Sequence, residues 1–215
     1  MSAPISSPNS NHNDPYDLED DYEDNIDQND PSDHGAILKT LHSFGQRIGH
    51  IAWYQNLGTG LNPECRNLAE HYLQQLGFPD CQPLLVRDWL EASDAAESLD
   101  WNSPSWEAEE HYRSMLTADA VDILGEEALE IAMMSLQEIA APVLEQHILD
   151  AARYQAIQDE TFLRAANGAA LRAIYLAALV LITGQDQDHP FALKFQLFEQ
   201  GRWPLDIVGQ SFNIY

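Results

Sequence analysis

The chain has 215 residues, of which 35 are acidic and 10 are Lys or Arg, giving a formal net charge of −25. This acid surplus excludes a simple nucleic-acid-binding surface, because such affinity comes mainly from Lys and Arg side chains that neutralise phosphates. It disfavours binding to anionic lipid headgroups for the same reason. Hydrophobic residues make up 45% of the chain, enough for one domain with a sizeable core. A charged partner is therefore expected to be a basic protein surface.

The composition divides the chain into a disordered acidic tail at residues 1–34 and a helical domain at residues 35–215. The tail holds ten acidic residues and neither Lys nor Arg, and such a segment cannot offset the entropy of ordering. The other 25 acids face all 10 bases, so the domain itself keeps a charge of −15. The sequence shows no secretory signal or membrane-spanning run, which predicts a cytoplasmic protein.

Apolar residues in the tail recur at a helical spacing. Leu18, Tyr22 and Ile26 are four residues apart, so a helix would align them on one side of an acidic rod, with Tyr16 close by. This pattern predicts a segment that folds on a partner with an apolar groove rimmed by Lys and Arg. The alternative is a tail that only keeps the protein soluble.

The first part of the domain is expected to be helical. Apolar residues at steps of three and four predict a helix over residues 36–54. Asn62 and Pro63 are typical of a helix start and Gly77 of a helix end, so a second helix lies between them. Pro83 is expected to begin a shorter third helix.

The next helices are predicted from their start and stop residues. Ser103 and Pro104 should begin a helix after a loop, and Gly125 should interrupt it. Pro142 removes a backbone donor and clashes with the preceding turn, so we expect a kink or break there. A long helix is predicted to follow over residues 143–166.

The segment at about residues 168–183 is apolar nearly all round, which predicts the buried central helix of a compact, mainly α, multi-helix domain. Residues 191–197 alternate like a strand but also fit a helical face. The residues from Gly201 to Pro204 are typical of a turn. The C-terminus should therefore contain a small hairpin, or a last helix followed by an extended segment.

Catalytic and metal-binding signatures are weak. Glu107 and His111 would lie one helical turn apart, with Glu110 beside them, but the Glu-x-x-His pattern of metal-binding bundles is absent. In so acidic a chain, a solvated helix face is the favoured interpretation. Cys81 precedes the helix start predicted at Pro83, where the helix dipole could lower a thiol pKa, but neither Lys nor His is near it in sequence and Asp80 opposes that shift. Cys65 lies on the apolar face of its helix, so both cysteines are expected to be structural. Phosphate-binding loops and nucleophile elbows are also absent. We therefore expect neither metal nor cofactor, and a non-enzymatic protein is favoured.

Arg202 and Trp203 are the last candidates for partner binding, because Trp and Arg dominate the hot spots of protein interfaces. The alternative is a Trp that caps the core and an Arg paired with a carboxylate. The leading functional hypothesis is a regulator or assembly factor that binds a basic protein. A nucleic-acid-mimicking inhibitor of a DNA-binding protein and a metal-dependent helical-bundle enzyme are the alternatives. Neither the partner nor the oligomeric state can be read from the sequence.

Overall fold

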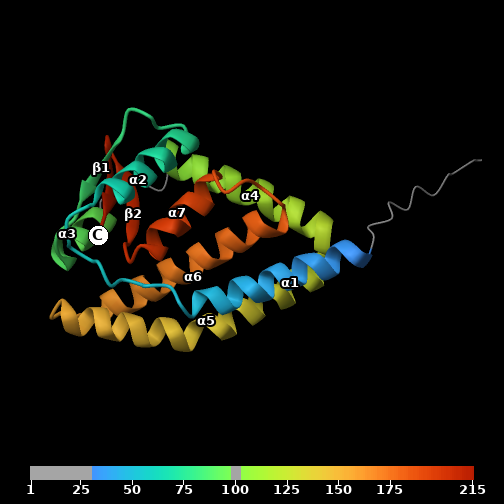
Figure 1. Cartoon of the computed structure of the whole chain (residues 1–215). Helices are drawn as coiled ribbons and strands as arrows, with labels where there is room; N and C mark the ends of the chain where they lie inside the picture. Colours follow the sequence, from blue (N-terminus) through green and yellow to red (C-terminus); the bar gives the residue numbers. More distant parts are fainter. Residues whose placement is uncertain (1–30, 98–102) are drawn as a thin grey trace, which may run out of the picture.

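The computed structural model describes residues 31–97 and 103–215, with side chains from His34 onward. These residues form seven helices and a three-stranded sheet, so the predicted mainly α domain is confirmed (Figure 1). The helices are α1 (Pro31–Ile48), α2 (Pro63–Leu76), α3 (Trp89–Glu97), α4 (Pro104–Leu124), α5 (Glu126–Tyr154), α6 (Glu160–Ile182) and α7 (Pro190–Glu199). The strands are β1 (Gln82–Leu85), β2 (Pro204–Val208) and β3 (Ser211–Ile214).

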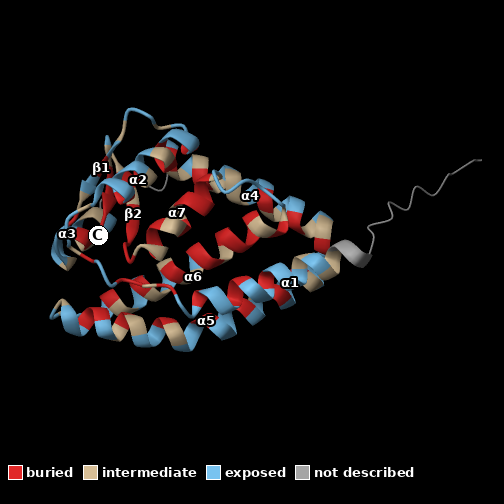
Figure 2. Cartoon of the chain, in the orientation of Figure 1, coloured by how far each residue is buried: buried red, intermediate tan, exposed pale blue. Residues whose placement is uncertain are grey.

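Helix α6 forms the centre of the domain, as its apolar composition predicted. Nearly every residue from Ala173 to Ile182 is buried, and α1, α4, α5 and α7 all pack against α6. Figure 2 shows this burial along the helix. Among the described helices, α6 alone is long and apolar enough to cross a membrane, with a mean hydropathy of 1.7, but 56% of that window is buried inside the domain. The core helix of a globular domain meets the same criterion.

A smaller second core lies between α2, α7 and the sheet. The central strand, β3, runs parallel to β1 and antiparallel to β2. The backbone N–H groups of Gln82 and Val86 point toward β3, so the nitrogen of Pro83 faces the free edge, where its missing proton removes no ladder bond. The helix predicted to begin at Pro83 is therefore wrong, because this segment is an edge strand.

Several helix ends follow the residues that predicted them. The Asn62 side chain accepts the backbone N–H of Cys65 at 2.7 Å, and Gly77 ends α2 in the left-handed conformation at a φ of 96°. Ser103 caps α4, and Gly125 separates α4 from α5. Local capping chemistry thus fixes the ends of these helices.

Two predicted helices have the wrong ends. The helix predicted over 36–54 stops at Ile48, because the chain then turns to bury the side chains that follow. The helix predicted over 143–166 is two helices: α5 continues through Pro142 without a break, and Asp159 caps a separate α6. Pro142 is exposed and is tolerated inside α5.

At the C-terminus, both predicted alternatives occur in succession. Residues 190–199 form helix α7, whose first turn is capped by the His189 ring accepting the N–H of Phe191 at 3.1 Å. Strands β2 and β3 then form the small hairpin, with Gly209 in the left-handed conformation at its turn. The hairpin closes the second core.

Candidate functional site

The Arg202 side chain holds the loop between α1 and α2. Its guanidinium donates to the backbone carbonyl oxygens of Asn56, Thr59 and Gly60 at 2.5, 2.6 and 2.7 Å. Arg202 is only 4% exposed and Trp203 only 5%, so neither side chain is presented to a partner in this structure. The Trp203 ring stacks on Trp89 at 5.9 Å, which fits a residue that caps the core. Arg202 binds carbonyls rather than the expected carboxylate.

The other predicted partner-binding residues lie outside the described part of the chain. These are Tyr16, Leu18, Tyr22 and Ile26, all within residues 1–30. The hypothesis that they form a docking element therefore stays a prediction.

Among the described residues, the candidate metal ligands Glu107, Glu110 and His111 do not form a metal site. Glu110 forms an ion pair with Arg113, and this bond holds the pKa of Glu110 below its usual value. Glu107 and His111 are exposed side chains of α4. Within residues 31–97 and 103–215, no group of three or more His, Cys, Asp or Glu side chains is arranged to hold a metal ion.

Both cysteines are free thiols. Cys65 is fully buried in the second core, as its place on the apolar face of α2 predicted. Burial raises the pKa of Cys81, and the nearby Asp80 carboxylate raises it further. The helix start expected after Cys81 is strand β1, so no helix dipole lowers that pKa.

A buried ionic group joins α2, α4 and α7. The Glu109 carboxylate accepts the Lys194 ammonium at 2.6 Å and the Tyr72 hydroxyl at 2.5 Å. Burial opposes the charged form of Glu109, but Lys194 and Tyr72 outweigh it and hold the Glu109 pKa below its usual value. Sequence reasoning missed this group, because its members are far apart in the chain and their burial is set by the packing of three helices. Its satisfied bonds indicate a structural role.

The outer side of α5 has a different character. From Ser114 to Ala152 the chain contains eight acidic residues and neither Lys nor Arg, and all eight acids are exposed. Steps of four, three, four and seven residues place five side chains on one outward line of α5, which we call the α5 stripe. The stripe consists of Glu127, Ile131, Met134, Glu138 and Glu145. Ile131 is 57% exposed and Met134 53%, so two large apolar side chains lie in this acidic line and face solvent.

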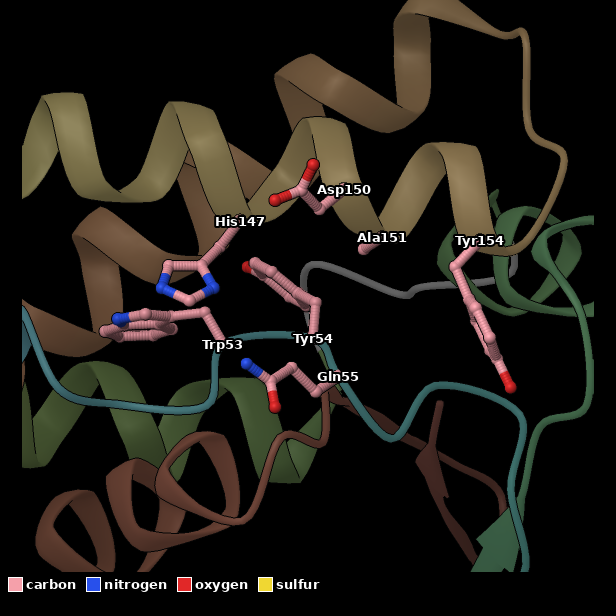
Figure 3. A pocket seen from close by; sticks show the side chains of 7 residues that line it. All are labelled: Trp53, Tyr54, Gln55, His147, Asp150, Ala151 and Tyr154. Carbon is pink, nitrogen blue, oxygen red and sulfur yellow. The ribbon is translucent and has the colours of Figure 1, made fainter.

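A pocket of about 370 Å³ opens between the end of α5 and the loop that joins α1 to α2 (Figure 3). Its lining residues are Trp53, Tyr54, Gln55, His147, Asp150, Ala151 and Tyr154. The Trp53 indole N–H donates to the Ile48 carbonyl at 3.1 Å, and the Tyr54 hydroxyl donates to the Ala166 carbonyl at 2.5 Å. Trp53 is 0% exposed and Tyr54 1%, so two fully buried rings close the floor, and the exposed aromatic surface of the pocket comes from Tyr154. The rim carries the polar groups.

The backbone at Tyr54 explains how two consecutive rings reach this floor. Tyr54 has a φ of 61°, a left-handed conformation that costs a non-glycine residue roughly 1–3 kcal/mol. In an extended chain, neighbouring side chains point to opposite sides. The left-handed turn instead lets Trp53 and Tyr54 line the same pocket.

Comparison with known proteins adds no relative. No protein-family model matches the chain, and neither a characterised protein nor a solved structure matches it. Function is therefore inferred from the described residues and their geometry.

Proposed function

We propose that this protein is a non-enzymatic interaction protein, a regulator or assembly factor, that binds a basic partner along the α5 stripe. The carrying observation is the combination of three exposed carboxylates with two exposed apolar side chains, Ile131 and Met134, on one helix face. Apolar area supplies affinity on binding, and the surrounding carboxylates select a partner of opposite charge.

The dimensions of the stripe indicate the shape of the partner. Glu145 lies 18 residues after Glu127, which corresponds to about 27 Å along the α-helix. An amphipathic helix of similar length, with two apolar residues between Lys or Arg side chains, matches this pattern. The absence of basic residues from Ser114 to Ala152 leaves the carboxylates of the stripe without a competing cation in that segment.

The apolar members of the stripe also favour a protein partner over nucleic-acid mimicry. A surface that imitates DNA needs regularly spaced charge and gains nothing from exposed Ile131 and Met134. A protein groove gains from both.

The test is capture of partners from native lysate with the full chain and with the variant Glu127→Gln/Glu138→Gln/Glu145→Gln. Three lost ion pairs at about 0.5 kcal/mol each predict roughly ten-fold weaker capture. High salt should release the partner from the unchanged protein, because exposed charges are screened. Ile131→Ser/Met134→Ser should also lose the partner, whereas Leu90→Ser, at a 71% exposed site on α3, should keep it.

The matched charge control is Glu64→Gln/Glu70→Gln/Asp80→Asn. It removes three exposed carboxylates in and beside α2, and Glu64, like Glu127, lies in the first turn of its helix. The free energy of unfolding of both triple variants should lie within about 0.5 kcal/mol of that of the unchanged protein. Equal loss of capture in both would show that net charge alone attracts the partner, and no loss in either would contradict the proposal.

A further inference from the structure

The pocket of Figure 3 has one exposed aromatic ring, Tyr154, and one carboxylate, Asp150. Trp53 and Tyr54 close its floor, and Tyr154, the last residue of α5, is 79% exposed at its far end. The α5 side contributes His147 and Asp150. A volume of about 370 Å³ suits a single side chain or a small ligand.

The charge around the pocket favours a cation over an anion. The lining includes one carboxylate, Asp150, and neither Lys nor Arg. Cations are attracted to aromatic faces, and Arg in particular stacks its planar guanidinium on them. The α5 segment leading to the pocket carries only acidic charge, which raises the local concentration of cations.

The Asp150 carboxylate already holds a guanidinium in this structure. Its Oδ1 accepts from Arg153 Nη1 at 2.8 Å, and its Oδ2 accepts from Gln146 Nε2 at 2.9 Å. A carboxylate offers about four lone-pair sites, so Asp150 can accept further bonds. The Arg153 side chain is 70% exposed, and an exposed pair of this kind contributes little to stability, so an incoming cation can compete with it.

We propose that this pocket binds the guanidinium side chain of an arginine on the basic partner. The arginine lies against the Tyr154 ring with its charge toward Asp150. This inference rests on the proposed function, since it assigns one side chain of that partner to one site. His147, Asp150 and Tyr154 lie on a side of α5 different from that of the stripe, so this arginine is a separate anchor on the partner. A buried Arg in a pocket is a typical interface hot spot.

The pocket can be tested without the partner, using N-acetyl-arginine amide as the probe and its neutral isostere N-acetyl-citrulline amide as the control. Two-dimensional NMR of the aromatic side chains of the full chain would follow the Tyr154 and His147 signals. The arginine probe should shift both signals with a dissociation constant in the millimolar range. Citrulline should shift neither.

Variants separate the contributions of charge and ring. Asp150→Asn and Tyr154→Ala should each weaken the arginine probe by roughly three-fold or more. Arg153→Gln should tighten it, because the competing guanidinium is gone; a purely structural role for this ion pair would not produce that gain. Glu199→Gln breaks a comparable exposed pair, with Arg47 at 2.8 Å, and should leave probe binding unchanged.

The outcomes distinguish this inference from the proposed function. Equal shifts with arginine and citrulline, or full binding to Asp150→Asn, would overturn the pocket assignment while leaving capture by the α5 stripe intact. Capture of the partner that is unaffected by Tyr154→Ala and Asp150→Asn would overturn it as well. Weaker capture by these two variants, together with selective binding of the arginine probe, would support it.

Discussion

The junction of α2, α4 and α7 and the outer side of α5 treat charge in opposite ways. At the junction, Glu109 is buried and bound by Lys194 and Tyr72. On α5, the exposed carboxylates of the stripe lie in a segment without a single Lys or Arg. Within the described residues, at least five of the ten basic side chains are bound by protein groups: Arg47, Arg113, Arg153 and Lys194 in ion pairs and Arg202 by carbonyls. Of these cations, Lys194 binds the buried Glu109 carboxylate and Arg202 is itself buried, whereas α5 carries no Lys or Arg before Arg153 in its last turn.

This contrast separates the buried charges, which affect stability, from the exposed charges, which affect binding. A buried ion is costly once its partner is removed, whereas exposed charges contribute little to folding and much to the choice of partner. Variants at the junction should therefore change unfolding, and variants of the α5 stripe should change association.

The largest effect is expected from Lys194→Met. The substitution leaves the Glu109 carboxylate, which is only 10% exposed, without its cation, and should lower the free energy of unfolding by about 3–5 kcal/mol. Urea denaturation at neutral pH would measure it. The control is Arg47→Met, at an exposed pair, with an expected loss below about 1 kcal/mol. Equal losses of unfolding free energy in Lys194→Met and Arg47→Met would contradict the difference between buried and exposed ion pairs.

Arg202→Met should rank second. Three carbonyl oxygens lose a charged donor, which predicts destabilisation by about 3 kcal/mol and faster amide hydrogen exchange in the loop between α1 and α2. Arg66→Met, at an exposed position of α2, is the control and should have little effect. An unchanged loop in Arg202→Met would mean that this guanidinium does not hold it.

Asp206→Asn should have a smaller effect that depends on pH. Burial raises the pKa of Asp206 above its usual 3.8, and the neighbouring Glu109 adds to this. A raised carboxyl pKa contributes stability below 3.8 that is lost as the pH rises through the folded-state value. Asp206→Asn should thus stabilise the protein at neutral pH by about 1 kcal/mol at most, with no gain in strong acid.

The melting temperature across the acid range would check this sign. Glu109 should behave in the opposite way, because its pKa lies below 4.5 and its contribution disappears as the pH falls. Asp188→Asn, at an exposed position, is the control and should leave the profile unchanged. Destabilisation by Asp206→Asn at neutral pH would show that the carboxylate is favourably held.

Local sequence signals predicted the parts of the fold that are decided locally. Asn62, Ser103 and Gly77 mark real helix ends, and the apolar segment of α6 is the central helix. Strand β1 could not be predicted from its own four residues, because it exists through pairing with β3, far along the chain. Tertiary pairing there overrides the helix-start preference of Pro83.

The candidate site was predictable only in part. The acidic character of the domain was plain from composition, but the outward direction of Ile131 and Met134 depends on which side of α5 packs on α1 and α6. The pocket brings together Tyr54 and Asp150, which are far apart in the chain. It depends on the left-handed backbone at Tyr54, a conformation that a Tyr in the sequence does not predict. Arg202 and Trp203 have the composition of an interface but are buried in this structure, where Arg202 binds loop carbonyls.

Methionine oxidation of the captured complex tests the central claim most directly. Met134 in the α5 stripe is 53% exposed and Met115 on α4 is 49% exposed, so the chain contains its own reporter and its own control. With hydrogen peroxide and mass spectrometry, the partner should protect Met134 several-fold and leave Met115 as reactive as in the free protein. Equal oxidation of Met134 with and without the partner would contradict binding along α5.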